Sequence, residues 1–280
     1  MKRSDRIKLN FIRNWALPGK ERLSHFFAPS KELKDSIKDG IVWLNNEDIA
    51  IYTTADNYIE WTILSTGTYE DEINKLIRIS VKAGDVCLDI GGNIGLQSIR
   101  MAQCVGSTGR VYAFEPLNHL QEKLKRNLAL NRIDNVTLLP FALSDEESET
   151  EFSLDEHAWN QGTFSLNNTT GANKQQVQVK VGDNMNEIRS LPAISLIKID
   201  VEGFEFHVLR GLRTCLEKHR PRIIFEYDAN YWQAAGQNIA DCFTFFTSLN
   251  YKLYQVNSFG CELIAHAGDA LGGNLFCIPA

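Results

Sequence analysis

The chain has 280 residues, of which 44% are hydrophobic and 23% are charged, and its formal net charge is −6. This composition excludes a disordered chain, a collagen-like repeat and a small disulfide scaffold. The length allows one large α/β domain or two domains. Because an acidic protein has no general attraction for phosphate backbones, we expect no nucleic-acid partner.

The spacing of cysteines and histidines indicates neither a disulfide framework nor a metal site. The six cysteines are scattered without a Cys-x-x-Cys pair, and the six histidines form no His-x-His or His-Glu-x-x-His spacing. We therefore predict reduced cysteines, no metal and a cytoplasmic location.

The first 80 residues do not alternate regularly between strand and helix patterns. Phe11 and Trp15 lie among the cations of a basic N-terminus, so this segment could rest on a membrane surface, although a helix docked on its own domain is favoured. Helical signals at 31–38 and strand-like runs at 41–44 and 49–53 follow. We assign residues 1–80 to an N-terminal cap on the substrate side.

From Val81 onward, short apolar runs alternate with amphipathic segments. The predicted strands cover residues 86–90, 110–115, 136–143, 195–201, 222–227, 252–256 and 274–278. The predicted helices cover residues 96–104, 118–131, 205–218 and 239–249. This alternation predicts an α/β fold for residues 81–280, a mostly parallel sheet with helices on both faces. No apolar run of about 18 residues is present, so we expect no integral membrane segment.

A polar stretch near residues 146–180 interrupts the alternation and is too long for a plain connection between elements. Its fragments at 150–154, 163–166 and 177–181 resemble short antiparallel strands joined by polar turns. We interpret the stretch as a β-rich insertion, whose Trp159, Asn160, Gln161 and Thr163 are candidate contacts for an acceptor.

The segment Asp-Ile-Gly-Gly-Asn-Ile-Gly at residues 89–95 lies where a predicted strand gives way to a helix. Open α/β sheets bind ligands at this edge, and glycines let the backbone turn sharply and approach a ligand closely. The carboxylate of Asp89 would repel a pyrophosphate, which disfavours a dinucleotide. It suits a ligand with a cationic amino group, such as S-adenosylmethionine.

Glu115 ends the next predicted strand, where a carboxylate can accept both hydroxyls of a ribose. Pro116 then ends the strand and directs the loop, and the turn at 142–145 would lie against an adenine. For an isolated residue, a solvated strand-end acid or an ordinary Ser-Asp turn is the plainer interpretation. The candidate cofactor-binding residues are Asp89, Gly91, Gly92, Asn93, Gly95, Glu115, Pro116, Ala142, Leu143 and Ser144.

Residues 69–280 resemble the FkbM family of S-adenosylmethionine-dependent methyltransferases. The resemblance rests on GDVCLDIGGNIG at 84–95, YAFEP at 112–116, ALSD at 142–145, LIKIDVEGFEFHVLRG at 196–211 and RPRIIFEYD at 220–228. The IKIDVEG-x-E run is the most specific of these motifs. Two departures are Gly92, where an alanine is commoner, and the segment at 181–188.

This resemblance implies a Rossmann-like class I methyltransferase sheet of seven strands, six parallel and one antiparallel. The cofactor, S-adenosylmethionine, would lie across the ends of the first two strands. The resemblance also implies methyl transfer to a hydroxyl group of a small molecule or a carbohydrate, as in a natural product or a glycan.

Lys198, Asp200 and Glu202 recur with a period of two along the fourth predicted strand and therefore point to one side. Such charges are costly to bury unless they are paired or functional. We predict that Asp200 or Glu202 orients the acceptor hydroxyl and takes its proton, with Lys198 holding the pair. A structural ion-pair cluster, with catalysis mainly by proximity, remains the alternative.

Several further residues are weaker candidates. A helix-start acid and a packing histidine are the favoured interpretations of Glu205 and His207. The remaining candidates are Glu226 and Trp232 for the acceptor pocket, and Tyr69 and Glu70 for the methionine end of the cofactor.

Two other functional classes stay open. A non-catalytic S-adenosylmethionine-binding partner module would keep the fold without transfer, and an NAD-type oxidoreductase would need a Gly-x-Gly-x-x-Gly turn without Asp89. The sequence contains no interface pattern from which to infer an oligomeric state.

Overall fold

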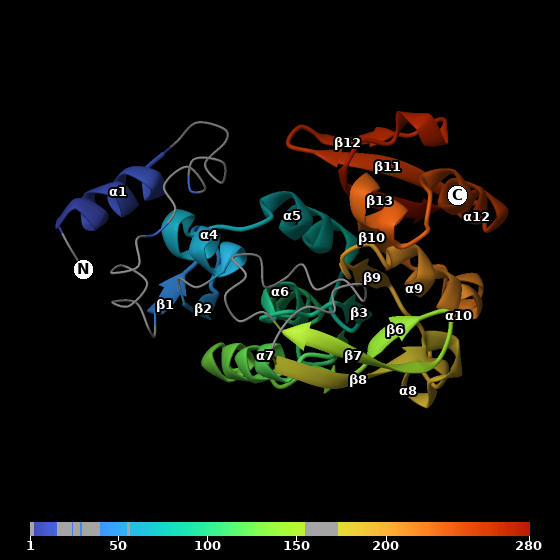
Figure 1. Ribbon diagram of the computed structural model, residues 1–280, viewed down its shortest axis with the longest axis horizontal. Coiled ribbons are helices and arrows are strands. Elements are labelled where there is room, and N and C mark those ends of the chain that lie inside the picture. Colours follow the sequence, from blue (N-terminus) through green and yellow to red (C-terminus); the bar gives the residue numbers. More distant parts are fainter. Residues whose placement is uncertain (1–2, 16–23, 25–28, 30–39, 55–56, 155–172) are drawn as a thin grey trace.

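The computed structural model describes residues 3–15, 24, 29, 40–54, 57–154 and 173–280 (Figure 1). Its largest feature is an eight-stranded sheet with the order β12-β11-β13-β10-β9-β3-β4-β5. The strands are β3 (Val86–Ile90), β4 (Arg110–Phe114), β5 (Val136–Leu139), β9 (Leu196–Ile199), β10 (Arg222–Tyr227), β11 (Tyr251–Asn257), β12 (Gly260–Leu263) and β13 (Gly273–Pro279).

The pairing directions confirm the predicted class I arrangement. The strands from β5 to β10 pair in parallel, and β13 pairs antiparallel with both β10 and β11. Because β10 and β11 are both antiparallel to β13, they point the same way, which makes six parallel strands and one antiparallel strand. The eighth strand, β12, is an edge strand that forms a hairpin with β11.

Helices cover the sheet in the described residues and explain why its central strands are apolar on both faces. They are α5 (Asp71–Ser80), α6 (Leu96–Val105), α7 (Asn118–Leu130), α8 (Asn186–Arg189), α9 (Glu205–Gly211), α10 (Arg213–His219), α11 (Ala229–Ala234) and α12 (Ile239–Ser248), with two short 3₁₀ helices, η1 (Gly182–Asn184) and η2 (Ala267–Asp269). Successive residues of β3 enter different core clusters: Leu88 packs with Leu209 and Phe246, whereas Cys87 packs with Ile77 and Met101.

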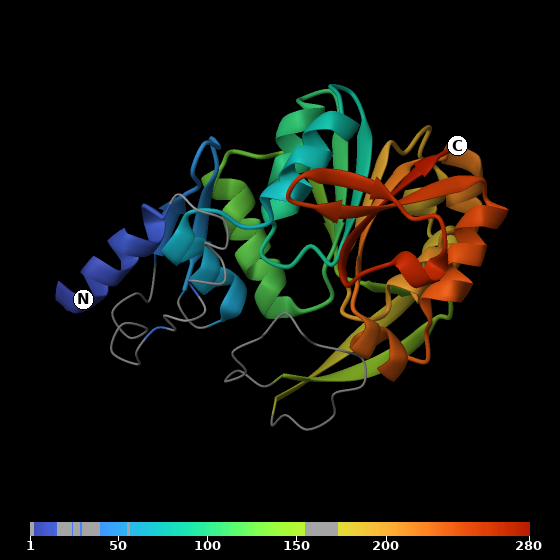
Figure 2. The ribbon, with the colours of Figure 1, turned by 90° about the horizontal axis from the view of Figure 1, so that it is seen from above.

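The N-terminal elements lie at one end of the molecule, beside α7, and the last strands lie toward the opposite end (Figure 2). They are α1 (Arg3–Arg13), β1 (Gly40–Trp43), β2 (Ala50–Thr53) and α4 (Tyr58–Thr66). The backbone N–H of Tyr52 donates to the side-chain oxygen of Asn127 at 2.7 Å, and Asn131 exchanges two hydrogen bonds with Ala50. Asn127 of α7 and Asn131, which directly follows this helix, therefore satisfy backbone groups of β2.

Helix α1 docks on the protein, as the favoured interpretation expected. Ile12 is fully buried, and the guanidinium of Arg13 donates to the carbonyl oxygen of Leu64 in α4. None of the described helices combines the length and the apolar character needed to cross a bilayer. The predicted helix at 31–38 lies outside the described residues, and the division of the chain at residue 80 stays a prediction.

Two predicted elements are divided in the structure. The strand expected at 136–143 breaks at Pro140, which has no N–H to continue a ladder. Its second half, β6 (Ala142–Ser144), joins β7 (Ser148–Leu154) and β8 (Asn173–Val181) in a separate sheet with the order β6-β8-β7. The helix expected at 205–218 divides into α9 and α10 at Leu212. The strand expected at 163–166 lies outside the described residues.

Candidate active site

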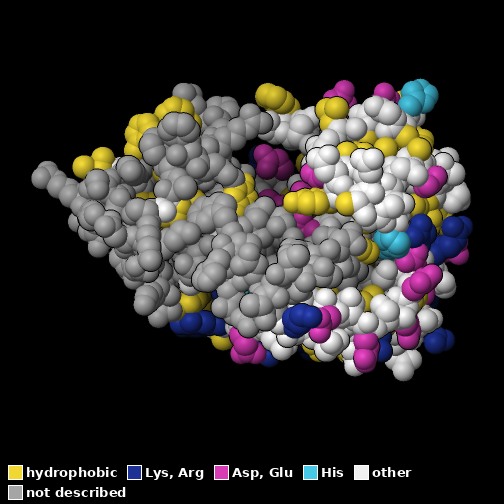
Figure 3. All heavy atoms as spheres, in the orientation of Figure 1, with side chains coloured by type: hydrophobic (Ala, Val, Ile, Leu, Met, Phe, Trp, Pro, Cys, Tyr) yellow, Lys and Arg dark blue, Asp and Glu magenta, His cyan; other side chains and the backbone are white. Residues whose placement is uncertain are grey.

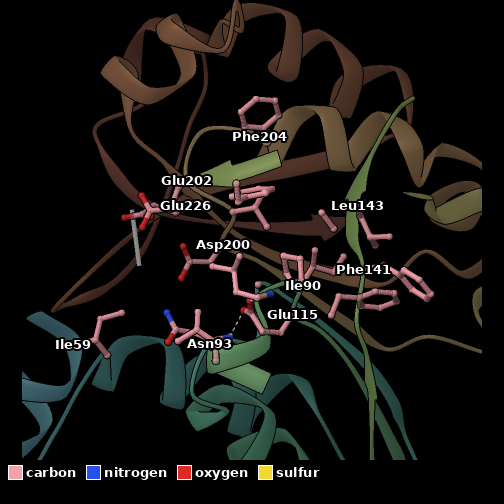
Figure 4. A pocket seen from close by; sticks show the side chains of 18 of the residues that line it. Ile59, Ile90, Asn93, Glu115, Phe141, Leu143, Asp200, Glu202, Phe204 and Glu226 are labelled. Atoms are coloured by element: carbon pink, nitrogen blue, oxygen red, sulfur yellow. Dashed lines mark hydrogen bonds between the residues drawn. The ribbon is translucent and has the colours of Figure 1, made fainter. Parts of the chain in front are cut away.

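A cavity of about 260 Å³ opens at the carboxyl ends of β3, β4, β9 and β10. Figure 3 shows acidic side chains inside a hollow near the middle of one face of the molecule, and Figure 4 shows the side chains of the cavity from close by. Most of the predicted site residues line it: Gly91, Asn93, Glu115, Pro116, Ala142, Leu143, Asp200 and Glu202. Strand ends far apart in the sequence thus meet at one edge of the sheet.

The glycine loop folds tightly against the neighbouring strands. A Cβ atom at Gly91, where φ is 84°, would lie 1.9 Å from the carbonyl oxygen of Asp200. A Cβ atom at Gly95 would lie 2.9 Å from Leu124 Cγ, and one at Gly92 would lie 3.1 Å from Leu124 Cδ1. Gly92 and Gly95 do not line the cavity, so the structure places them in packing between the loop and α7.

Glu115 is held in place by the loops around it. Its side chain is 4% exposed and accepts hydrogen bonds from the backbone N–H groups of Asn93 at 2.8 Å and Leu117 at 2.9 Å (Figure 4). Burial raises the pKa of this carboxyl group to about 7. A carboxylate can accept further hydrogen bonds beyond these two, so Glu115 can still accept the hydroxyls of a ribose.

Asp89 and Lys198 lie beneath the cavity rather than on its wall. They are direct neighbours in the pairing of β3 with β9, and both side chains are buried. Ser98 donates to one carboxylate oxygen of Asp89, and the other oxygen has no partner among the described residues. The Lys198 ammonium contacts Asp200 at 3.0 Å. Burial lowers the pKa of Lys198, but the charges of Asp200, Asp89 and Glu70 outweigh burial and raise it.

Three carboxylates meet on one wall of the cavity. One oxygen each of Asp200, Glu202 and Glu226 lies within 4.8 Å of the other two (Figure 4). Burial, with the neighbouring charge of Asp200, raises the pKa of Glu202 and of Glu226 to about 9. Oxygens at this spacing could hold a cation. No sequence spacing predicted the cluster, because Glu226 comes from a different strand.

Glu205 holds the turn that carries Glu202. Its carboxylate is 1% exposed and accepts hydrogen bonds from the backbone N–H groups of Val201 at 2.9 Å and Gly203 at 3.0 Å and from the indole of Trp232 at 2.8 Å. Glu202 has a φ of 53° and Gly203 one of 98°, both in the left-handed region. Glu205 was expected only as a helix-start acid, whereas the structure gives it a positioning contact with this turn.

The other candidates fall into three groups. Trp232 is 1% exposed and packs between Phe206 and Phe225, so its expected role as a flat face for an acceptor is wrong. His207 contacts Asp145 and Gln237 and does not line the cavity, and Ser144 donates to Asp145 at 3.2 Å behind the wall. Trp159, Asn160, Gln161 and Thr163 lie outside the described residues.

Sequence reasoning missed most of the aromatic lining. Tyr58, Phe141, Phe204 and Tyr231 all line the cavity. They come from four separate segments, and no pattern in the sequence around them distinguishes an aromatic residue that lines a cavity from one that packs in the core. Tyr69, Glu70 and Glu226, which were weaker candidates, do line it.

Comparison with known proteins adds a family match. The family model described as Methyltransferase FkbM domain matches residues 89–253. Hexuronic acid methyltransferase AglP from Haloferax volcanii is 30% identical over 149 residues, which are 53% of this chain and 58% of that protein. Methyltransferase 1 from Beauveria bassiana is 27% identical over 143 residues, which are 45% of this chain and 57% of that protein.

The chain therefore spans little more than half the length of these two curated relatives. Among solved structures, methyltransferase FkbM from Methylobacillus flagellatus is similar with a TM-score of 0.46 and 15% sequence identity. That match covers 79% of this chain and 53% of the other.

Proposed function

The chain belongs to the FkbM family of S-adenosylmethionine-dependent methyltransferases, and on this premise we propose that it transfers a methyl group to a hydroxyl group of a small molecule or a sugar. One observation carries the proposal. A single cavity joins Glu115, at a ribose-binding position, to the carboxylates of Asp200 and Glu202, which can receive a hydroxyl proton.

The groups on the cavity wall fit the family's cofactor. Glu115 suits the ribose hydroxyls, and the apolar side chains of Phe141 and Leu143 suit an adenine. The carboxylates at the β9 side suit the cationic end of the molecule. When bound, S-adenosylmethionine supplies an activated methyl group on a sulfonium.

The residues at the end of β9 would act on the acceptor. Asp200 or Glu202, in its ionised form, would accept a hydrogen bond from the acceptor hydroxyl and fix the direction of its oxygen. The same carboxylate would take the proton as the new O–C bond forms and the bond between the methyl carbon and the sulfur breaks, which leaves S-adenosylhomocysteine. Lys198, buried and 3.0 Å from Asp200, holds that carboxylate in place. Glu205 holds the turn on which Glu202 stands.

The charge of the wall favours a neutral acceptor group. Among the described lining residues, Glu70, Glu115, Asp200, Glu202 and Glu226 are acidic and none is a lysine or arginine. An acceptor carboxylate would be repelled by this wall unless a cation accompanied it. The relative from Haloferax volcanii is named for a hexuronic acid. We take from it the sugar class of acceptor, and we assign the methylated atom here to a neutral hydroxyl.

A labelling experiment tests this function. The protein is incubated with methyl-labelled S-adenosylmethionine and a panel of neutral glycosides, uronates and macrocyclic polyols, and products are analysed by mass spectrometry and NMR. We expect the label in an O-methyl group, with neutral hydroxyl compounds preferred to uronates. Label on nitrogen or carbon, or preference for uronates, would contradict the proposal.

The same preparation separates the alternative functions by calorimetry. Binding of S-adenosylhomocysteine without transfer to any member of the panel would favour a non-catalytic partner module. Binding of NAD in place of S-adenosylhomocysteine would favour an oxidoreductase.

A further inference from the structure

Tyr231, on helix α11, lines the cavity and is also partly exposed to solvent. Asp228 caps this helix, because its carboxylate accepts hydrogen bonds from the backbone N–H groups of Asn230 at 2.8 Å and Tyr231 at 3.1 Å. Tyr231 is 36% exposed, whereas the next residue, Trp232, is 1% exposed. The buried indole therefore anchors the short helix, and the tyrosine ring stays accessible beside the cavity.

The backbone of Tyr231 packs closely against the turn that carries Glu202. A Cβ atom at Gly203 would lie 2.8 Å from the carbonyl oxygen of Tyr231 and 2.9 Å from its Cβ atom. Glu205 joins the same two segments, since its carboxylate accepts hydrogen bonds from the backbone N–H of Gly203 and from the indole of Trp232. Contacts within the fold therefore fix the position of Tyr231 relative to Glu202.

The strand order separates α11 from the expected place of the cofactor's nucleoside. The helix directly follows β10, whereas Glu115 directly follows β4, and β9 and β3 lie between these two strands. Asp200 and Glu202 follow β9, so they come between Glu115 and α11 along the edge of the sheet. A cofactor with its ribose at Glu115 would therefore leave the space beside Tyr231 for the acceptor.

An accessible aromatic ring beside carboxyl groups suits a sugar ring. A pyranose presents C–H groups on its two faces, which can pack on an aromatic ring, and hydroxyl groups at its edge, which form hydrogen bonds. Burial, with the charges of Glu202, Asp228 and Glu226, raises the pKa of the Tyr231 phenol above its ordinary value. The ring therefore stays uncharged, and carboxyl groups able to bind the sugar hydroxyls lie close to it.

We propose that Tyr231 is a specificity-determining residue, whose ring stacks on the pyranose ring of the acceptor and thereby sets which hydroxyl group faces Asp200 and Glu202. The inference rests on the proposed function and narrows its acceptor from small molecules in general to glycosides with a pyranose ring. Acyclic and macrocyclic polyols offer no such ring face and would lose this contact.

Steady-state kinetics with the neutral pyranoside that the wild type methylates fastest test this role. Tyr231→Ala should raise the KM for that acceptor on the order of tenfold, and kcat should fall less, because the stacked ring is lost. Tyr231→Phe keeps the ring, so its KM should stay within about threefold of the wild-type value. NMR of the product should find the label at one hydroxyl position for the wild type and at several for Tyr231→Ala, which a merely structural role would not cause.

Phe259→Ala is the matched control. It removes an aromatic ring that is 99% exposed and does not line the cavity, so it should change neither the KM nor the methylated position. Calorimetry with S-adenosylhomocysteine checks that the variants keep the folded cofactor site, with affinities within about twofold of the wild-type value.

A comparison on the wild type alone covers the case in which Tyr231→Ala does not fold. The alditol of the same sugar carries hydroxyl groups without the ring, and its kcat/KM should be lower on the order of tenfold or more.

Three results would overturn the proposal while methyl transfer to a hydroxyl, and with it the proposed function, stands. They are a Tyr231→Ala variant with the KM and methylated position of the wild type, equal use of the pyranoside and its alditol by the wild type, and preference for a macrocyclic polyol. Absence of label from every hydroxyl compound would instead contradict the proposed function itself, and this inference would fall with it.

Discussion

At the scale of single residues, Asp200 and Glu202 differ in how they are held. Asp200 contacts the buried Lys198 ammonium, whereas Glu202 stands on a left-handed turn beside Glu226. Burial and neighbouring negative charge raise the pKa of Glu202 to about 9. When ionised, such a carboxylate is a stronger base than an ordinary glutamate.

Substitution of these two acids tests their catalytic role. With an acceptor identified from the panel, Asp200→Asn and Glu202→Gln should each lower turnover. Substitution of the residue that takes the proton should lower turnover on the order of 10²–10⁴-fold. S-Adenosylhomocysteine should still bind Glu202→Gln, as calorimetry can show. Near-normal turnover in both variants would mean that the acids brace the sheet and that proximity carries catalysis.

Glu205 is a positioning residue, so its substitution should affect stability as well as turnover. Glu205→Gln keeps the shape of the side chain but replaces one carboxylate oxygen by an NH₂ group. That group cannot accept the hydrogen bonds that N–H donors now give to the carboxylate. We expect a loss of about 1–3 kcal/mol in the free energy of unfolding, measured in urea. Turnover should fall more than the acceptor KM changes, because the turn that carries Glu202 loses its support. The exposed Glu217→Gln is the control for both measurements.

At the scale of elements, the strand that ends at a glycine was predictable, and contacts between distant segments were not. The run Val86–Ile90 was predicted to the residue, because it is apolar except for Asp89 and ends at Gly91. The prediction of one strand over residues 136–143 was wrong, because Pro140 interrupts this otherwise apolar run. Glu226 was a candidate for the acceptor pocket and lines the cavity, but its proximity to Asp200 and Glu202 depends on the order of the strands, which no local pattern contains.

The close approach of the glycine loop to β9 gives a prediction about an element junction. Gly91→Ala would place a methyl group 1.9 Å from the carbonyl oxygen of Asp200, in a left-handed conformation. The two strand ends must then separate. We expect loss of S-adenosylhomocysteine binding in calorimetry and destabilisation of more than about 2 kcal/mol.

Gly106→Ala is the matched control for that substitution. Gly106 also has a positive φ, of 63°, but a Cβ atom there would meet nothing within 4 Å. This variant should carry only the backbone strain, of about 1–3 kcal/mol, and should bind S-adenosylhomocysteine normally. Equal effects of the two substitutions would show that the conformation of Gly91 matters and its contact with β9 does not.

At the scale of the whole molecule, several acidic residues of a chain with a net charge of −6 gather in one place. Glu70, Asp200, Glu202 and Glu226 share a single cavity, with Lys198 behind them. Such a grouping destabilises the folded protein unless protons or a cation offset it. The acidic composition that argued against nucleic acid therefore also has a local role in the proposed recognition of a cationic cofactor.

The buried carboxyl groups in and around the cavity predict how the stability of the protein depends on pH. Burial raises the pKa values of Glu115 and Glu205 from 4.5 to about 7 in the folded protein, and those of Glu202 and Glu226 to about 9. Between about pH 5 and pH 9 the folded state therefore binds more protons than the unfolded state, so the free energy of unfolding falls as pH rises. We expect a fall on the order of a few kcal/mol over this range, measured by urea unfolding at successive pH values. Glu226→Gln should make the free energy of unfolding fall less steeply with pH on the alkaline side. This substitution removes one carboxyl group with a raised pKa and one negative charge that raises the pKa of Glu202. A free energy of unfolding that rises between pH 5 and pH 9 would contradict the expected protonation of these buried carboxylates.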